Sequence, residues 1–235
     1  MAFRKESLVF GEFYHIYNRG NSKQDIFIDE SDRDRFVKLL YLCNSSQKIR
    51  FREDIVERKI DAWDFDRGEP IVSIGAWVLM KNHFHIYLTP GKLLGKIGKN
   101  TKEKESPISI FIRKLGTAYS MYFNKKYQRV GKLFEGHFKS VCVQSDPQAK
   151  YVFSYIHLNP LKIIDPLWKE RGLKNIKKSL TFLNRYSWSS YSDYRNIMRS
   201  ENKILSKHNF PDYFFNKKMF DKEIFDWFTF PKELP

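Results

Sequence analysis

The chain has 235 residues, of which 42% are hydrophobic and 17% aromatic, and it carries a formal net charge of +15. This is enough apolar material for one large domain, or one domain with an appendage, and the charge favours a polyanionic partner, nucleic acid above all, over the alternative of general solubility. The two cysteines lack CxxC spacing, no apolar run approaches the about 18 residues of a membrane span, and the N-terminus lacks a signal-peptide core, so we expect a cytoplasmic protein without a zinc cluster, disulfide framework or membrane partner.

Secondary structure is predicted from the spacing of apolar residues, which alternate in strands and recur at three and four positions in helices. In the first part of the chain we expect, in order, a strand over 13–18, a helix over 31–44, a charged loop with room for one short helix over 47–70, strands over 71–80 and 83–88, and a mobile basic loop over 91–106. The Lys81-Asn82 pair is expected to form the tight turn between the two paired strands.

The next elements complete a known supersecondary order. We expect a helix over 107–127, a strand over 132–144, and a helix that begins at Asp146-Pro147 and stops before Pro160. The order β-α-β-β-α-β, followed by a further helix, predicts an α+β fold: a ferredoxin-like antiparallel sheet with helices on one face. Residues 1–160 would form this domain, and residues 161–235 a basic and aromatic extension packed on it.

The positive charge is concentrated in two segments. Residues 95–140 contain eleven Lys and Arg against three Asp and Glu, and residues 160–185 contain seven against two, so these segments hold thirteen of the fifteen net charges. Both flank the helix predicted over 146–158. This placement favours a groove that follows a phosphate backbone over a uniformly basic surface.

Two pairs of residues predict a reaction centre. His83 and His85 lie on one face of a strand, because strand side chains alternate with period two, while Tyr155 and Asn159 lie four apart on one helix face. If the strand and helix pack together, three metal-binding groups converge beside one phenol, where Mg²⁺ or Mn²⁺ could hold a phosphate for attack by tyrosine. Strand histidines are more often structural, Tyr151 is an alternative nucleophile one turn earlier, and an amide before proline could equally be a helix cap.

In four segments the sequence resembles the REP-associated tyrosine transposases, which are single-tyrosine HUH transposases acting on single-stranded DNA. The similar segments are LMKNHFHI at 79–86, RVGKLFEGHFK at 129–139, YIHLNP at 155–160 and YSWSSY at 186–191, and the resemblance covers roughly residues 10–195. Two positions depart from the family pattern. Lys81 stands where proline is usual, and His137 where arginine is common, which puts a phosphate contact at His137 in doubt.

The resemblance implies an HUH nuclease fold with assigned roles for the site. It implies His83, His85 and Asn159 as ligands of Mg²⁺ or Mn²⁺, and Tyr155 as the nucleophile that forms a 5′-phosphotyrosine and frees a 3′-OH. The implied substrate is single-stranded DNA with a hairpin or palindromic repeat, cut and rejoined by a nucleoid-associated bacterial protein. A monomer and a homodimer both remain possible.

Several further side chains are candidates for DNA contact, each with a plainer alternative. The candidates are Arg113, Lys114, Lys125, Lys126, Arg129, Lys132, His137, Lys139 and Trp188. Solvated surface charge is the alternative for the cations, and core packing is the alternative for Trp188. We expect His15 and His157 to have packing roles, although the sheet could place His15 near the site.

Two other functions fit the same residues. A nucleic-acid-binding regulator could keep this fold without cutting DNA, and it would bind equally well when metal is chelated. An RNA-processing metal enzyme would cleave RNA without a covalent tyrosine adduct.

Overall fold

The computed structural model describes residues 8–91, 105–212 and 216–229. The strands are β1 (Phe13–Arg19), β2 (Val72–Met80), β3 (His83–Pro90) and β4 (Lys139–Val143). The α-helices are α1 (Glu30–Leu42), α2 (Pro107–Lys126), α3 (Asp146–Leu158), α4 (Trp168–Arg171), α5 (Ile176–Arg185), α6 (Tyr191–Tyr194) and α7 (Lys217–Thr229). Short turns of other helix types are Asn21–Lys23, Arg52–Glu57, Ala62–Asp64, Asn159–Ile163, Ser200–Ile204 and Lys207–Asn209.

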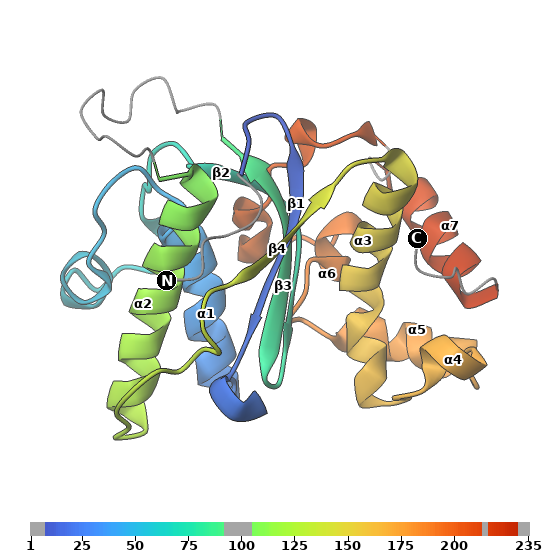
Figure 1. Cartoon of the computed structure of the whole chain (residues 1–235), viewed down its shortest axis with the longest axis horizontal. Helices are drawn as coiled ribbons and strands as arrows, with labels where there is room; N and C mark the ends of the chain where they lie inside the picture. The colour runs from blue at the N-terminus through green and yellow to red at the C-terminus, as the bar shows by residue number, and fades with distance from the viewer. Residues whose placement is uncertain (1–7, 92–104, 213–215, 230–235) are drawn as a thin grey trace.

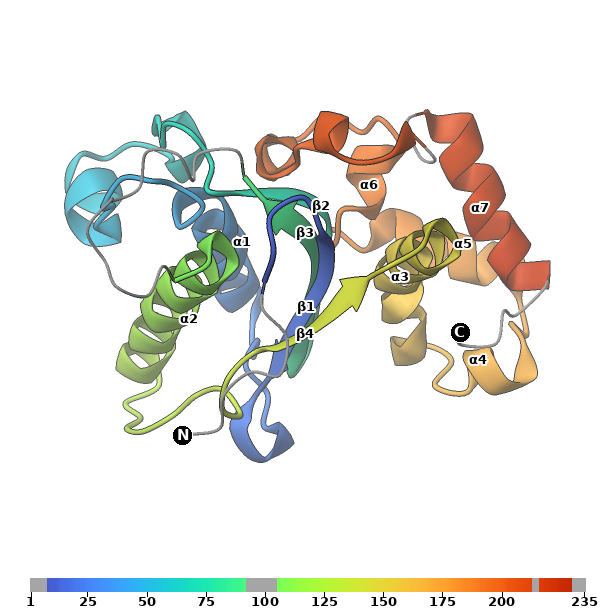
Figure 2. The same ribbon diagram turned by 45° about the horizontal axis from the view of Figure 1, so that its top comes forward.

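The strands form one antiparallel sheet in the order β2-β3-β1-β4 (Figure 1). With α1 between β1 and β2 and α2 between β3 and β4, this is the ferredoxin-like arrangement, so the predicted α+β fold class is confirmed. The two crossover helices lie together on one face of the sheet, which we call the first face (Figure 2).

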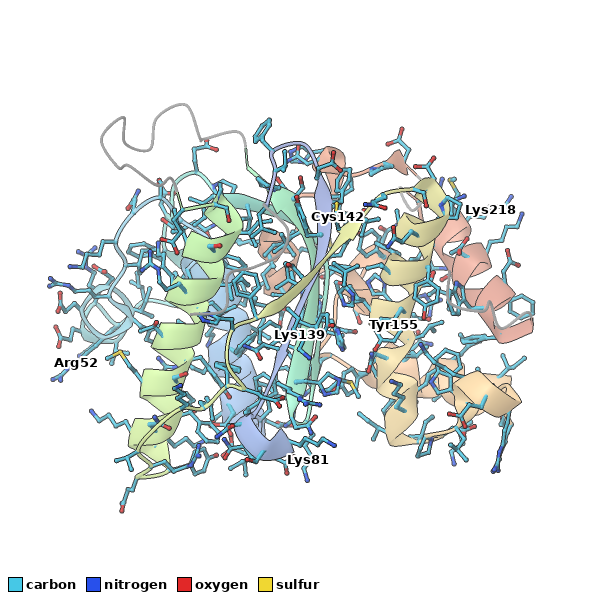
Figure 3. The ribbon with its side chains drawn as sticks, viewed as in Figure 1. Arg52, Lys81, Lys139, Cys142, Tyr155 and Lys218 are labelled. Atoms are coloured by element: carbon cyan, nitrogen blue, oxygen red, sulfur yellow. The ribbon has the colours of Figure 1, made fainter. Side chains whose placement is uncertain are left out.

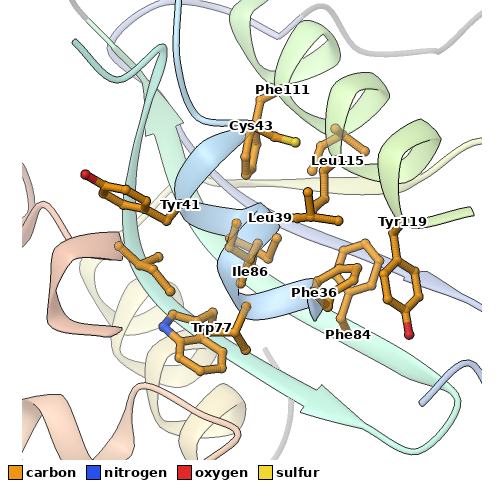
Figure 4. Close-up of a cluster of buried hydrophobic side chains, with 14 of the residues drawn as sticks. Phe36, Leu39, Tyr41, Cys43, Trp77, Phe84, Ile86, Phe111, Leu115 and Tyr119 are labelled. Carbon is orange, nitrogen blue, oxygen red and sulfur yellow. The ribbon is translucent and has the colours of Figure 1, made fainter. Parts of the chain in front are cut away.

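The main hydrophobic core fills the space between the first face and the two crossover helices (Figure 4). Alternate residues of β3, including Phe84 and Ile86, point into this core, where the Phe84 ring contacts Phe36 of α1 and Phe36 in turn contacts Tyr119 of α2. Each helix begins at a side-chain cap, because Asp29 accepts from a backbone amide of the first turn of α1, and Ser106 does the same for α2. The apolar periodicity of the sequence therefore specifies this half of the fold.

The sequence predicts helices on one face of the sheet, but in the structure the second face is covered as well (Figure 2). Ala76, Val78 and Met80 of β2 point to this face and join a second core with α3 and the extension. The buried residues that the extension contributes to this core include Trp168, Leu183, Tyr191, Tyr194, Phe220 and Trp227. A strand with apolar residues on both faces needs cover on both sides.

The extension also covers the outer edge of the sheet at β2. Leu79 N–H donates to the Trp188 carbonyl at 2.9 Å, and Ser190 N–H donates to the Trp77 carbonyl at 2.9 Å. Behind this edge, the fully buried His157 of α3 contacts Ser190 Oγ through Nε2 at 2.8 Å. These bonds pair polar groups that an open edge strand would leave exposed, and they attach the extension to the sheet.

Three segments differ in detail from the expectations. The last strand is limited to Lys139–Val143, because the preceding segment turns at Gly131 and Gly136, both with positive φ. The loop over 47–70 includes two short helical turns, and most of the loop over 91–106 lies outside the described residues. Among the helices that the structure describes, none is long and apolar enough to cross a bilayer.

Candidate active site

The structure brings the two strand histidines, Tyr155 and Asn159 together on the second face of the sheet. His83 and His85 are adjacent, with ring centroids 5.1 Å apart, and the His85 ring lies 5.3 Å from the Tyr155 ring in an edge-to-face contact. Tyr155 projects from the side of α3 that faces the sheet (Figure 3). Asn159 follows α3 directly, and its side chain lies close enough to His83 and Tyr155 to influence the pKa of both.

The hydrogen bonds around the two histidines leave Nε2 of His83 available as a ligand, and Nε2 of His85 as well when His85 donates to His15. Asn82 Nδ2 donates to the Lys23 carbonyl at 3.0 Å, so Asn82 Oδ1 must accept the 2.7 Å bond from His83 Nδ1. His83 Nε2 then keeps its lone pair. His85 Nδ1 lies 2.9 Å from His15 Nε2, and if His85 donates in this bond its Nε2 is likewise unprotonated. A second hydrogen bond of this kind orients most metal-binding histidines in proteins.

Three polar atoms at the centre of the site are buried, and none forms a hydrogen bond of good geometry with a residue that the structure describes, although the Asn159 carboxamide is near enough to His83 and Tyr155 to interact weakly with both. They are His85 Nε2 and both polar atoms of the Asn159 carboxamide. Leaving such atoms unpaired costs about 1–3 kcal/mol each, so native proteins rarely keep them without a reason. A cation bound between the imidazole and the amide oxygen would satisfy the acceptor atoms.

The donor set suits a hard divalent ion only in part. Within the described ranges, no three His, Cys, Asp or Glu side chains are arranged to hold a metal. The protein would therefore supply two imidazoles and one amide oxygen. Mixed nitrogen and oxygen donors of this kind fit Mg²⁺ or Mn²⁺ when phosphate oxygens and water complete the coordination sphere.

Burial sets the protonation of the site. Desolvation, followed by the charges of Lys162 and Arg19, lowers the pKa of His83 to about 4. Desolvation also lowers the pKa of His85 well below its ordinary value and raises that of Tyr155. Both imidazoles are therefore neutral near pH 7, as ligands must be, whereas the phenol is a poor nucleophile unless positive charge stabilises its anion.

Two lysines that sequence reasoning did not single out lie over the Tyr155 ring. Lys169 Nζ of α4 is 4.0 Å from the ring centroid, and Lys162 Nζ, from the turn after α3, is 5.6 Å from it. Burial, followed by the charge of Lys162, lowers the pKa of Lys169 to about 8. The only sequence signal for these two side chains is the basic excess over 160–185.

Tyr151, the alternative nucleophile, is held farther from the histidines. Its ring stacks on Tyr155 at 6.1 Å and contacts Trp227 of α7 at 5.1 Å. Burial, followed by Tyr155, raises the pKa of Tyr151 to about 12. These contacts make Tyr151 part of the packing between α3 and α7, whereas Tyr155 contacts the rings of both His85 and His15.

The DNA-contact candidates on α2 lie on the first face, across the sheet from Tyr155, and three of them have protein partners. Arg113 pairs with Glu105 at 2.9 Å, and Lys114 Nζ donates to the Ser45 carbonyl at 2.6 Å. Lys126 Nζ contacts two carboxylates, Asp29 at 2.7 Å and Asp32 at 2.8 Å. Lys125, on the same helix, is exposed.

The remaining cationic candidates lie after α2. Lys132 and His137 are exposed, and the Arg129 guanidinium lies over the Phe123 ring at 5.6 Å. Lys139 pairs with Tyr17 across β1 and β4, which places both on the second face with the site (Figure 3). Of these cations, Lys139 is the one whose sheet register directs it to the Tyr155 side.

The aromatic candidate Trp188 packs against the first core, and its carbonyl accepts from β2. This is the packing alternative raised for Trp188 from the sequence. In the same extension, α5 carries a shallow basic groove, lined by Asn175, Lys177, Lys178, Thr181, Phe182 and Arg185.

Comparison with known proteins finds likeness to solved structures alone. No family model and no curated protein matches the chain. The chain is similar to a solved REP-associated tyrosine transposase bound to a REP hairpin, with a TM-score of 0.48 and 12% identity, over 86% of this chain and 90% of the other. At this level of similarity, the chemistry of the site depends on this chain's own residues for its support.

Proposed function

We propose that the protein is a metal-dependent single-stranded DNA endonuclease and strand transferase of the transposase type. It would act in the bacterial cytoplasm on DNA with a hairpin or palindromic repeat, through a covalent 5′-phosphotyrosine. The observation that carries the proposal is the contact between Tyr155 and His85 beside an unpaired imidazole nitrogen and an unpaired carboxamide. The substrate class rests on the sequence resemblance and on the net charge of +15.

In this proposal Tyr155 attacks the scissile phosphate in line. The bond from Tyr155 Oη to phosphorus forms, the bond from phosphorus to the 3′ oxygen breaks, and the phenolic proton leaves to solvent while the 3′ oxygen takes one up. His83, His85 and Asn159 would hold Mg²⁺ or Mn²⁺, which when bound neutralises charge on the phosphate. Attack by a second 3′-OH reverses the step, and because a diester is exchanged for a diester no ATP is needed.

Hydrogen bonds to the far nitrogen of each histidine support the same assignment. His15 contacts Nδ1 of His85, and Asn82 contacts Nδ1 of His83, so both imidazole rings are oriented in the absence of metal and DNA. This preorganisation favours a working enzyme over a binding regulator, because a regulator would gain nothing from buried, unpaired ligand atoms.

One assay tests the proposal. The full chain is incubated with labelled hairpin DNA and Mn²⁺, and a protein–DNA band that survives denaturation is expected from wild type and Tyr151→Phe but not from Tyr155→Phe. Tyr155→Phe should still bind the hairpin in EDTA. A band from Tyr155→Phe would move the nucleophile to Tyr151. Binding without an adduct in any protein would indicate the regulator, and RNA cleavage without an adduct the RNA-processing enzyme.

A further inference from the structure

We propose that Lys162 and Lys169 form a phosphate-binding site over Tyr155, through which the C-terminal extension completes the reaction centre. The inference rests on the proposed function and adds to it a second point of contact with the DNA strand. The ligand is a phosphodiester, either the scissile one or its neighbour. It would be held by two ammonium groups beside the tyrosine, apart from the side chains that hold the metal.

The first support is the placement of the two ammonium groups. Both lie over the Tyr155 ring, with Nζ 4.0 Å from the ring centroid for Lys169 and 5.6 Å for Lys162. Both are also close enough to His85 to lower its pKa by their charge. Trp168 is buried in the second core and fixes α4, so Lys169 is presented by a packed element rather than by a free tail.

The second support is that the pair lacks a counter-charge. Neither lysine forms an ion pair with a carboxylate in the part of the chain that the structure describes. Each lysine is half-buried. Burial, and then repulsion by the charge of Lys162, lower the pKa of Lys169 to about 8. A cation–π contact with Tyr155 offsets only part of this cost. An anion bound between them would remove both penalties.

The chemistry of the site indicates which anion. A lysine that served only to pack on Tyr155 would need no second ammonium beside it. Tyrosine attack leaves a phosphodiester covalently attached to Tyr155, with one negative charge that remains next to this ring until the strand is rejoined. Lys162 and Lys169 are positioned to bind that charge before, during and after the transfer, and to favour the tyrosine anion during attack.

The test measures binding without cleavage. An oligonucleotide that spans the cut site is titrated against the full chain in EDTA at several salt concentrations. Each cation that contacts a phosphate contributes about 0.7 to the slope of log affinity against log salt for a single strand. Lys169→Met and Lys162→Met should each lower the slope by about this amount, the double variant by about 1.4, and Lys169→Arg should restore it.

The test includes a matched control variant and a set of oligonucleotides in which single phosphates are uncharged. Lys222→Met removes the same charge from an exposed position on α7 and should leave the slope unchanged. Replacing single phosphates of the oligonucleotide by uncharged methylphosphonates should weaken wild-type binding at one or two positions near the cut. At those positions the double variant should be insensitive to the replacement.

The outcomes separate the inference from the proposed function. Equal sensitivity of wild type and double variant to every methylphosphonate would overturn the phosphate site, whether or not Tyr155 cuts DNA. The inference is likewise overturned if Lys169→Met and Lys169→Arg, both folded by circular dichroism, give the same slope. If the double variant loses the sensitivity to methylphosphonates that wild type has, but Tyr155 never forms an adduct, the phosphate site stands and the proposed transfer chemistry fails.

Discussion

Replacing Asn159 with leucine should make the protein more stable and abolish its response to metal. The Asn159 side chain is fully buried, and neither of its polar atoms forms a hydrogen bond of good geometry with a described residue, although the carboxamide interacts weakly with His83 and Tyr155. Each such atom costs about 1–3 kcal/mol, and leucine has a similar volume without polar atoms. Because the carboxamide keeps weak contacts with His83 and Tyr155, the expected gain is less than the sum of two such costs. We therefore expect Asn159→Leu to raise the free energy of unfolding in EDTA by about 1–3 kcal/mol, and each kcal/mol should raise Tm by about 2–4 °C.

The same variant should lose the stabilisation that a bound ion gives. An ion at one hundred times its Kd stabilises the folded state by about 2.7 kcal/mol. Thermal unfolding of wild type should therefore shift upward when EDTA is replaced by Mn²⁺, and that of Asn159→Leu should not. The variant would then be the more stable protein in EDTA and the less responsive one in Mn²⁺, a trade of stability against function.

Asn44 provides the matched control, because it is an equally buried asparagine with every partner in place. Its Nδ2 donates to the Val72 carbonyl at 2.8 Å, and its Oδ1 accepts from Val72 N–H at 2.9 Å. Asn44→Leu should cost at least about 2 kcal/mol, because it strands two buried backbone groups. If Asn159→Leu destabilises the protein as much as Asn44→Leu does, the Asn159 amide is a hydrogen-bonded cap, and the ligand assignment is wrong.

Three further outcomes are expected. His15→Phe should weaken Mn²⁺ binding by about 10–100-fold, measured by electron paramagnetic resonance, because His85 loses its hydrogen-bond partner. His15→Gln keeps an acceptor for His85 and should bind Mn²⁺ more tightly than His15→Phe. Equal affinity of the two variants would refute the orienting role of His15. Burial lowers the pKa of His157 to about 3, so the neutral imidazole contributes its full stabilisation above about pH 6.5 and loses it as pH falls toward 3. The free energy of unfolding, measured in urea, should therefore fall with pH over this range, and His157→Gln should reduce that slope by up to about 1.4 kcal/mol per pH unit. An unchanged slope would contradict the role of His157. Lys126→Met should lower the free energy of unfolding by about 1–3 kcal/mol, because Asp32 loses its ion pair, while hairpin affinity stays within about two-fold; the opposite pattern would make Lys126 a DNA contact.

The fold and the meeting of the main site residues could be predicted from local periodicity. A period of two places His83 and His85 on one strand face, and a spacing of four places Tyr155 and Asn159 on one helix face, so only the packing of strand on helix had to be assumed. The roles of these four residues stay predictions. The order of strands followed from the same signals, which is why the sheet agrees with the expectation.

The parts that could not be predicted depend on register and on long-range packing. His15 contacts His85 only because β1 pairs with β3 in one register, and a shift of one residue would turn it to the other face. Lys169 reaches Tyr155 only because Trp168 docks in the second core, and Trp188 meets β2 through backbone atoms that carry no sequence signal. Periodicity within one element contains no information on such contacts between elements.

The pairing of the extension with the sheet edge has a consequence for how the protein is made. The β2 edge bonds to Ser190, which lies 113 positions later in the chain than its partner Trp77. A chain leaving the ribosome at about 5–20 residues per second would present this edge unpaired for at least several seconds before its cover is synthesised. Contacts so distant in sequence also form slowly. Synthesis of the segment around Ser190 is therefore the step that covers the β2 edge of the nascent sheet.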